Sequence, residues 1–346
     1  HIPAVNTTPE SYVIQESFRK MVDAGLDVVV MEVSSQGLMM HRVGGFVFDI
    51  GIFTNLEPDH IGPNEHASFE EYMECKGMLF KQCRLGIVNA DDEHTEKMLA
   101  GHTCEIETYG LSEKADLRAT DMELIKGKGY LGVKYHAKGL VDCPVEIHVP
   151  GRFSVYNSLT AIAVCHHFKV TTENIQSALR AAKVKGRIEI VKVSDDFTLM
   201  IDYAHNAMSL KSLLSTLQEY EPGRLVCLFG CGGNRSKLRR YEMGEVSGNM
   251  ADLTIITSDN PRYEEPQAII NDIKVGMGKT DGKFVEIADR KEAIRYAIAH
   301  AKPGDVIVLA GKGHEDYQEI CGVKHHMDER ELIREVLEEE DVSKIC

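Results

Sequence analysis

The sequence lacks the features that would place a protein in a membrane, outside the cell or on nucleic acid. No apolar run among its 346 residues approaches the roughly 20 that a membrane-spanning helix needs. No signal peptide is visible, and the nine cysteines are an odd number without paired spacing, which predicts reduced thiols. The net charge of −15 argues against non-specific nucleic-acid binding. We therefore expect a cytoplasmic monomer with no nucleic-acid or membrane partner.

A phosphate-binding P-loop is also missing from the sequence. Gly278-Lys279-Thr280 has the right ending, but Ile273 stands where the first glycine is required, and a helical pattern precedes it instead of a strand. The chain begins at His1 and enters a motif almost at once. We expect it to be a piece of a longer protein.

The length, composition and order of the predicted strands and helices indicate an α/β fold. The length suits two domains, and 43% apolar with 27% charged residues is typical of globular proteins. The predicted elements of the first half are a helix 10–24, strands 26–32, 47–53 and 86–89, a helix 69–81, antiparallel edge strands within 118–149, and helices 151–167 and 172–182. Further strands are expected near 197–202, 224–229, 252–257, 284–287 and 305–310. This alternation predicts two doubly wound domains, 1–184 and 185–346.

The stretch from Thr257 to Arg262 is the most informative segment. It follows an apolar run, Leu253 to Ile256, that has the character of a buried parallel strand. Ligands of open α/β sheets bind beyond the carboxyl ends of such strands. Here Asp259, Asn260, Pro261 and Arg262 offer an acceptor for an ammonium group and a guanidinium that can grip a carboxylate with two hydrogen bonds. The loop therefore suits a zwitterionic amino acid.

Two further loops follow predicted strands of the same half. Gly311-Lys312-Gly313-His314-Glu315 allows close backbone approach and adds an anion for an amine. Alone it would more often be a plain turn, but a second polar strand-end loop in the same domain favours a binding loop. The run from Leu228 to Arg235 is rich in glycine, but Arg235 holds the place of the third glycine of a dinucleotide fingerprint. We interpret Arg235 as an anion contact.

The first half offers candidates for a magnesium site. Glu32 ends one predicted strand and His60 follows another, so a carboxylate and an imidazole could hold Mg²⁺ between phosphates. Lys76, on the predicted helix 69–81, is by default a surface lysine. Carbamylation is the chemistry that would make it special, because a desolvated neutral amine reacts with CO₂ and gains an anionic group. Asp202 to Asn206 could face a nucleotide or form a simple turn.

Together these segments resemble the Mur ligase family, the ATP-dependent amino-acid ligases of peptidoglycan synthesis. The resemblance runs from Asn6-Thr7-Thr8-Pro9 to Asp328-Glu329-Arg330. It implies a central ATPase domain, here without its P-loop start, and a Rossmann-like C-terminal domain. The form Asp259-Asn260-Pro261-Arg262 resembles that of members that add meso-diaminopimelate.

The resemblance also assigns residues to ligands. It implies contacts to the UDP-muramoyl peptide from Asn6, Thr7, Thr8, Ser34 and Arg42. It implies a catalytic and metal-binding set of Glu32, His60 and Lys76, with Lys76 as N6-carboxylysine. It implies nucleotide contacts from Asn157, Arg187, Asp202 and His205. It implies amino-acid contacts from Arg235, Asp259, Asn260, Pro261, Arg262, Gly311 and Glu315.

The implied activity is the ATP- and Mg²⁺-dependent joining of meso-diaminopimelate to UDP-MurNAc-L-Ala-D-Glu through an acyl phosphate. Without a P-loop we expect this chain by itself to hydrolyse no ATP and to bind diaminopimelate poorly. A lysine-adding Mur ligase and a folylpolyglutamate synthase-like ligase are the alternatives within the reaction class. A non-catalytic binding module is the alternative outside it. Met40, Ser154 and Asn206 depart from the usual residues of the family.

Overall fold

The computed structural model describes residues 6–58, 61–62 and 65–345, and side chains as far as Glu339. The chain forms two compact units. The first comprises His1–Thr120, His136–Pro144 and Val155–Ile175, and the second comprises Asp121–Tyr135, Val145–Ser154 and Gln176–Cys346. Each unit contains parallel strands that alternate with helices, which confirms the predicted α/β class. The domain division at 184/185 remains a prediction.

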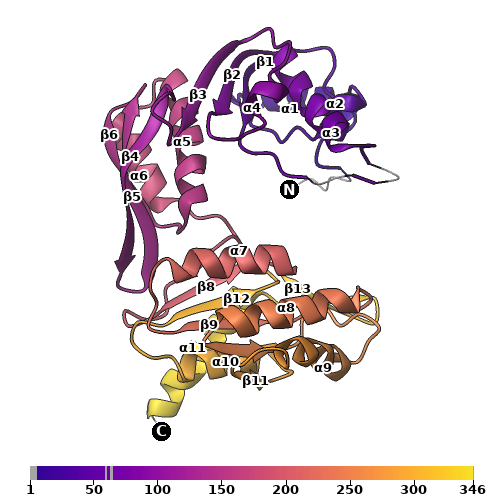
Figure 1. The fold of residues 1–346 in the computed structure, drawn as a ribbon, viewed down its shortest axis with the longest axis vertical. Coiled ribbons are helices and arrows are strands. Elements are labelled where there is room, and N and C mark those ends of the chain that lie inside the picture. Colours follow the sequence, from indigo (N-terminus) through magenta and orange to yellow (C-terminus); the bar gives the residue numbers. More distant parts are fainter. Residues whose placement is uncertain (1–5, 59–60, 63–64, 346) are drawn as a thin grey trace. The chain divides into compact units, whose positions relative to one another are not determined.

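The first half of the chain builds a six-stranded sheet of order β1-β2-β3-β4-β5-β6 (Figure 1). Its elements are α1 (Ser11–Asp23), α2 (Ser35–Met39), β1 (Phe48–Phe53), α3 (Phe69–Gly77), the 3-10 helix η1 (Met78–Lys81), β2 (Cys83–Asn89), α4 (Thr95–Met98), β3 (Glu105–Gly110), β4 (Leu117–Gly127), β5 (Tyr130–Gly139), β6 (Cys143–Ile147), α5 (Arg152–His167) and α6 (Thr172–Ala181). Strands β1 to β4 pair in parallel. The two-residue link between β4 and β5 can join only antiparallel neighbours, as the glycine-broken runs predicted.

The predicted strand 26–32 is wrong. The segment forms no ladder within the described residues, and Val28, Val29 and Val30 are exposed, Val30 by 86%. A strand is defined by its hydrogen-bonded neighbour, and an apolar run alone does not supply one. The predicted helix 69–81 is present but tightens into 3-10 geometry at Met78.

The second half builds another six-stranded sheet, of order β11-β10-β9-β12-β8-β7, and a separate two-stranded ribbon, β13-β14. Its elements are β7 (Glu189–Val191), β8 (Thr198–Asp202), α7 (Ala207–Gln218), β9 (Leu225–Phe229), α8 (Lys237–Met250), β10 (Leu253–Ile256), α9 (Pro266–Met277), β11 (Phe284–Glu286), α10 (Arg290–Ala299), β12 (Val306–Ala310), β13 (Tyr317–Ile320), β14 (Val323–His326) and α11 (Glu329–Ile345). All ladders are parallel except β7 with β8 and β13 with β14.

Helices cover both faces of this second sheet (Figure 1). Successive strand residues point to opposite faces, so Val306 and Val308 of β12 pack with α7, α8 and α9, whereas Ile307 and Leu309 pack with α10 and α11. The strands are therefore apolar on both faces, as expected for a parallel sheet between two helical layers.

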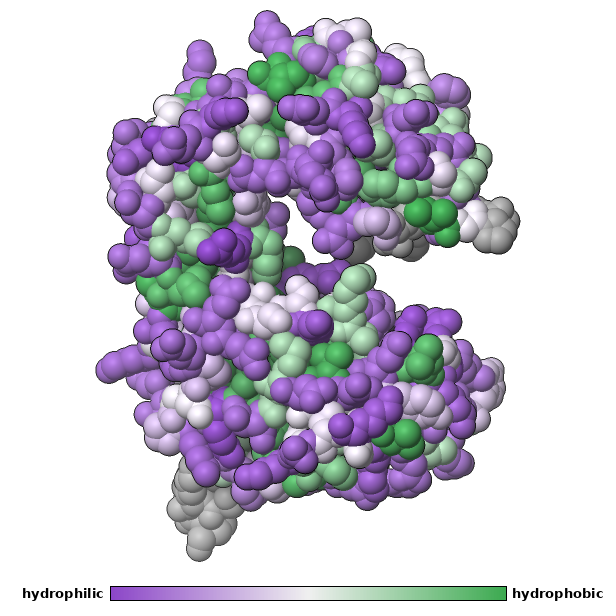
Figure 2. All heavy atoms as spheres, viewed as in Figure 1, coloured by the Kyte–Doolittle hydropathy of each residue, from purple (hydrophilic) through white to green (hydrophobic). Residues whose placement is uncertain are grey.

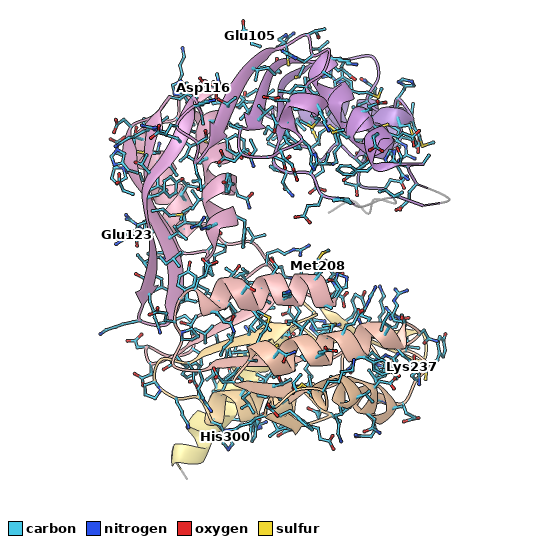
Figure 3. The ribbon with its side chains drawn as sticks, viewed as in Figure 1. Glu105, Asp116, Glu123, Met208, Lys237 and His300 are labelled. Atoms are coloured by element: carbon cyan, nitrogen blue, oxygen red, sulfur yellow. The ribbon has the colours of Figure 1, made fainter. Side chains whose placement is uncertain are left out.

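Helix α7 illustrates how sequence sets one of these layers. Asn206 caps its first turn in a capping box with Ser209, which satisfies backbone N–H groups that the helix cannot pair itself. Leu210, Leu213, Leu214 and Leu217 are buried at helical spacing against the sheet. Met208 instead projects from the outer side of the helix and is 73% exposed (Figure 3).

The surface of both units is dominated by hydrophilic side chains on the face that Figure 2 shows, with hydrophobic residues in small groups. Among the described residues, no helix has the length and apolar character that crossing a membrane requires.

Candidate functional site

Three loops that follow strands β9, β10 and β12 meet at one edge of the second sheet. These strands are neighbours in parallel register, so their carboxyl ends lie side by side. A Cβ added to Gly230 would lie 2.4 Å from the Thr257 carbonyl oxygen, and one added to Gly311 would lie 2.9 Å from Oδ2 of Asp259. Gly311 also has a φ of +109°, which disfavours other residues. The glycines predicted from sequence therefore allow the three loops to pack closely.

Arg262 is held in place by the ribbon. Its φ of +53° is unusual for a residue other than glycine. Its backbone N–H donates to the Glu319 carbonyl (3.0 Å), and the Cys321 N–H donates to its carbonyl (2.7 Å). Its guanidinium donates from Nε to Glu319 (3.0 Å) and from one terminal nitrogen to the Gly233 carbonyl (2.8 Å). A guanidinium has five N–H donors, so further donors remain for a ligand carboxylate.

Glu315 lies beside Asn260 and Lys312 in the same group of loops. Its Oε2 accepts from Asn260 Nδ2 (3.0 Å) and from Lys312 Nζ (2.8 Å). Burial by itself would raise the pKa of Glu315, but these hydrogen bonds and the charge of Lys312 outweigh it and hold the pKa below its usual value. The side chain is therefore a carboxylate that suits an ammonium group.

Asp259 is buried at the centre of the same loops. Its Oδ1 accepts from the Asn260 backbone N–H, and Lys312 Nζ lies 4.0 Å away. Gln318 of β13 donates to its backbone carbonyl (2.7 Å). Pro261 lines a cavity of about 420 Å³ that Gln318 and His325 of the ribbon also line. The structure thus brings together the predicted residues Asp259, Asn260, Pro261, Arg262, Gly311 and Glu315.

Arg235 is exposed at the end of the glycine-rich loop after β9. The loop is anchored by Arg240 of α8, which donates to the Gly232 carbonyl (3.2 Å) and pairs with Glu264 (2.8 Å) and Asp272 (2.9 Å). Hydrogen bonds from Arg240 are the main reason that the pKa of Glu264 falls to about 2. The network fixes the loop and leaves the Arg235 side chain in solvent.

A second cluster surrounds Tyr203, just after β8. The guanidinium of Arg187 lies 5.0 Å from the centre of the Tyr203 ring, and the rings of His205 and His314 lie 4.7 and 4.9 Å from it. Asp202 is committed to the backbone, because its two oxygens accept from the N–H groups of Ile188 and Ala204, both at 2.8 Å. Burial raises the pKa of Asp202. Arg187 and His205 are therefore the more available of the predicted nucleotide contacts.

In the first unit the structure joins three of the five residues predicted to contact the muramoyl peptide. The Thr8 hydroxyl accepts from the Ser34 N–H (2.8 Å) and donates to the Glu32 carbonyl (3.1 Å), and Arg42 donates to the Thr8 carbonyl (3.2 Å). Ser34 caps helix α2 by accepting from the Gly37 N–H. Asn6 and Thr7 are exposed beside this network.

The predicted metal site is only partly described. His60 lies outside the described residues, and Glu32 is exposed. Lys76 lies on α3 with its ammonium 5.0 Å from the centre of the Tyr72 ring, and burial lowers its pKa. In the described part of the chain, no group of three His, Cys, Asp or Glu side chains could hold a metal. Glu32 and a carbamylated Lys76 would supply two anionic oxygen ligands of the kind Mg²⁺ prefers.

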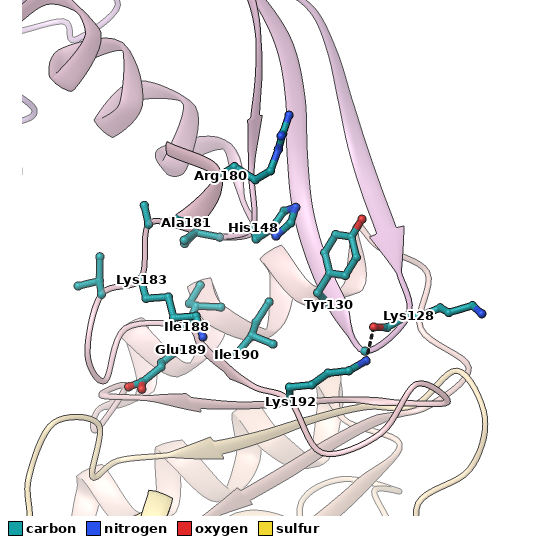
Figure 4. Close-up of a pocket in the computed structure, with 14 residues that line it drawn as sticks. Lys128, Tyr130, His148, Arg180, Ala181, Lys183, Ile188, Glu189, Ile190 and Lys192 are labelled. Carbon is teal, nitrogen blue, oxygen red and sulfur yellow. Dashed lines mark hydrogen bonds between the residues drawn. The ribbon is translucent and has the colours of Figure 1, made fainter. Parts of the chain in front are cut away.

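Asn157, the remaining predicted nucleotide contact, is exposed on α5 and belongs to the first unit, whereas Arg187, Asp202 and His205 belong to the second. A cavity of about 250 Å³ in the second unit lies elsewhere (Figure 4). Tyr130, His148, Ile188 and Ile190 line it, and none of the predicted site residues does. Lys192 closes one side by donating to the Lys128 carbonyl (2.6 Å).

The sequence did not predict the roles of several residues in the loop cluster. Lys312 belongs to a motif that was recognised, but no role was predicted for it. Glu319 comes from the ribbon, which was not predicted at all. No role was predicted for Arg290 or Glu329, which form a fully buried ion pair at 2.8 Å. Arg290 donates to the carbonyls of Ser258 and Ala310 and so ties the ends of β10 and β12 together.

The fold and these loops define a class of protein. The Mur ligase middle domain matches residues 2–165, and the Mur ligase glutamate ligase domain matches residues 186–313. The chain belongs to the Mur ligase family. These matches confirm the resemblance predicted from the motifs.

Comparison with individual proteins shows which members of the family this chain is similar to. The chain is 43% identical over 343 residues to the UDP-N-acetylmuramoyl-L-alanyl-D-glutamate–2,6-diaminopimelate ligase of Caldanaerobacter subterraneus subsp. tengcongensis. The alignment covers 98% of this chain and 70% of that relative. It is 42% identical to ligase 1 of the same name from Clostridium acetobutylicum, covering 98% and 69%. A solved structure of a ligase with this name superposes with a TM-score of 0.74 at 30% identity, covering 96% of this chain and 69% of that one.

Proposed function

We propose that this protein joins 2,6-diaminopimelate to the D-glutamyl residue of UDP-MurNAc-L-Ala-D-Glu with consumption of ATP. The observation that carries the proposal is the convergence of the three strand-end loops. They place a guanidinium with free donors, Arg262, and a carboxylate, Glu315, around Asn260. The relatives that share this chain's sequence over most of their length carry the name of that activity.

The selection of the amino acid follows from charge. Diaminopimelate differs from lysine by one additional carboxylate, which Arg262 would bind with a pair of hydrogen bonds. Lysine would leave those donors unpaired, and leaving a charged, partly buried donor without its partner is costly. Glu315 would accept from a substrate ammonium group. Folylpolyglutamate synthase-like and lysine-adding ligases are therefore less well supported than a diaminopimelate ligase.

The reaction would proceed in two balanced steps. The terminal phosphoryl group of ATP moves to an oxygen of the D-glutamyl side-chain carboxylate, giving an acyl phosphate and ADP. The amine lone pair of the amino acid then attacks the acyl carbon, the amide forms, the bond from carbon to the phosphate oxygen breaks, and phosphate leaves with loss of an amine proton. Bound Mg²⁺ would neutralise charge on the transferred group.

The chain's own residues would position the reactants. Thr8, Ser34 and Arg42 would hold the muramoyl peptide, with Asn6 and Thr7 at its exposed side. Arg187, Tyr203 and His205 would hold the nucleotide base by stacking and cation–π contact. The nucleotide contact of Asn157 stays a separate prediction for the first unit. Arg235 would meet a carboxylate of the amino acid. Glu32, carbamylated Lys76 and His60 would be the metal ligands.

The test is phosphate release by the whole gene product that carries this sequence, with ATP, Mg²⁺ and UDP-MurNAc-L-Ala-D-Glu. Meso-diaminopimelate, lysine and glutamate are supplied in separate assays, and the peptide products are identified by mass. We expect release that depends on diaminopimelate and exceeds that with lysine by at least about 100-fold in kcat/KM. Equal or greater turnover with lysine or glutamate would overturn the proposal.

A further inference from the structure

Lys312 is a buried lysine whose ammonium group is surrounded by acceptors of the protein itself. Its side chain is 0% exposed. Its ammonium donates to Asn260 Oδ1 (3.0 Å), to Glu315 Oε2 (2.8 Å) and to the Tyr317 carbonyl. An ammonium group has three N–H donors, so all of them are used within the protein. Lys312 thus has no donor left for a substrate, and any effect on the substrate must pass through its partners.

The contacts of Lys312 fix the orientation of Asn260. The amide oxygen accepts from Lys312 and from the Glu319 N–H (2.9 Å), and the amide nitrogen donates to Glu315. The opposite orientation would set an NH₂ group against an ammonium and against a backbone N–H. A single arrangement of the Asn260 side chain therefore satisfies all three neighbours, and the lysine is one of the groups that select it.

The same contacts determine which part of Glu315 remains free. Both donors, Asn260 Nδ2 and Lys312 Nζ, converge on Oε2. Among the described residues neither of these side chains bonds to Oε1. Asp259 and Glu315 together carry two negative charges against the one positive charge of Lys312. The cluster keeps an excess of negative charge and one carboxylate oxygen that can accept from a cationic amine.

We propose that Lys312 is a positioning residue for the amino-acid substrate: with Asn260 it orients Glu315 so that Oε1 receives an ammonium group of a diamino acid. The inference rests on the proposed function and adds to it the residue that prepares its ammonium acceptor. Without Lys312 the two carboxylates would lose the cation between them, Asn260 could turn over, and Glu315 would no longer be held in one rotamer.

The test compares Lys312→Met with wild type and with Lys283→Met, an exposed lysine of the same unit. KM is measured separately for diaminopimelate, ATP and the UDP-muramoyl peptide on protein whose thermal unfolding is cooperative. We expect the KM for diaminopimelate to rise about tenfold or more in Lys312→Met, on the scale of a charged hydrogen bond. The other two KM values and the Lys283→Met variant should stay within about twofold of wild type.

A double-mutant cycle separates positioning from general damage. If Lys312 acts through Glu315, then Lys312→Met combined with Glu315→Gln should raise the KM for diaminopimelate no further than Glu315→Gln alone. Additive effects, or a rise in all three KM values together, would overturn the inference. If Lys312→Met does not fold, Lys312→Arg carries the same tests, because it keeps the buried charge but not the compact geometry. Wild-type protein without diaminopimelate-dependent turnover would instead contradict the proposed function.

Discussion

At the scale of single residues, the candidate site is organised by charged groups that a ligand would not touch. Arg262 would meet the substrate, but Glu319 and the Gly233 carbonyl hold its guanidinium. Glu315 would meet the substrate, but Lys312 and Asn260 hold its carboxylate. Such supporting contacts convert flexible charged side chains into fixed ones, which lowers the entropy lost when a ligand binds.

Glu319 provides a test of this support. Glu319→Gln weakens the contact to Arg262 and should raise the KM for diaminopimelate about tenfold, because a hydrogen bond between charged groups is replaced by a weaker one. Steady-state kinetics measure the effect, with Glu338→Gln on the exposed side of α11 as the control. A lower KM would mean that Glu319 competes with the substrate for Arg262, contrary to this interpretation.

Lys76 provides a second test. Burial lowers its pKa, which increases the fraction of neutral amine that can react with CO₂. Wild-type protein in ¹³C-bicarbonate should give a carbamate carbonyl resonance, and Lys76→Arg, which stays cationic, should lack it. The same variant should lose about 100-fold in kcat, on the scale of damage to metal ligation. A Lys76→Arg variant with normal activity would remove Lys76 from the proposed metal site.

At the scale of elements, periodicity and strand ends were sufficient to predict most of the fold. In the second half, β8, β9, β10, β11 and β12 form close to their predicted bounds, whereas the short edge strand β7 was not predicted. The loops after β10 and β12 meet, with Asn260 donating to Glu315. The segment 26–32 failed because its apolar residues find no neighbouring strand among the described residues. The β13-β14 ribbon was missed because β14 is exposed throughout and carries two histidines, so no apolar alternation marks it.

The candidate site was harder to predict than the sheet. Residues that would contact a ligand lie in short polar loops after strands, and such loops are visible in a sequence. Lys312 and Glu319 act through contacts between segments that are far apart in the chain: Lys312 contacts Asn260, and Glu319 contacts Arg262. A lysine between two glycines has the sequence character of a solvent-exposed turn residue, and only the convergence of loops makes it a buried one.

The ion pair between Arg240 of α8 and Glu264 of the loop before α9 predicts how pH affects stability. The pKa of Glu264 falls to about 2 in the fold, from an ordinary value of 4.5. The stabilisation from its pairing with Arg240 is therefore complete above pH 4.5 and is lost as the pH falls from 4.5 toward about 2. Glu264→Gln should lower the urea midpoint at pH 6, and its difference from wild type should shrink as the pH falls through this range.

Glu265→Gln is the matched control for this prediction, because Glu265 is the exposed neighbour in the chain. Its urea midpoint should follow that of wild type at each pH. If the Glu264→Gln variant differs from wild type by the same amount at pH 6 and at pH 3, the ion pair with Arg240 does not carry the pH dependence.

At the scale of the whole molecule, the second unit is held together by a buried ion pair beneath the candidate site. Glu329, at the start of α11, pairs with Arg290, at the start of α10, and both side chains are at most 1% exposed. Arg290 also bonds to the ends of β10 and β12. The pair therefore connects the C-terminal helix to the strand ends from which the ligand-binding loops emerge.

Breaking this pair should destabilise the unit strongly. Arg290→Met leaves a buried carboxylate without a partner and should cost about 3–5 kcal/mol in free energy of unfolding. The double variant Arg290→Met/Glu329→Leu removes the stranded charge and should recover much of that loss. Urea unfolding followed by circular dichroism measures both. A double variant less stable than the single one would show that the pair is worth more than its apolar replacement.

The most direct test of the central claim is the choice between diaminopimelate and lysine by an Arg262→Lys variant of the whole gene product, compared with wild type and with Arg334→Lys on the exposed face of α11. The ratio of kcat/KM values for the two amino acids is measured under identical ATP and peptide concentrations. We predict that Arg262→Lys loses most of the preference for diaminopimelate, by about 100-fold in the ratio, because an ammonium group cannot reproduce the paired hydrogen bonds to the second carboxylate. An unchanged ratio in Arg262→Lys would contradict the assignment of Arg262 as the group that recognises that carboxylate.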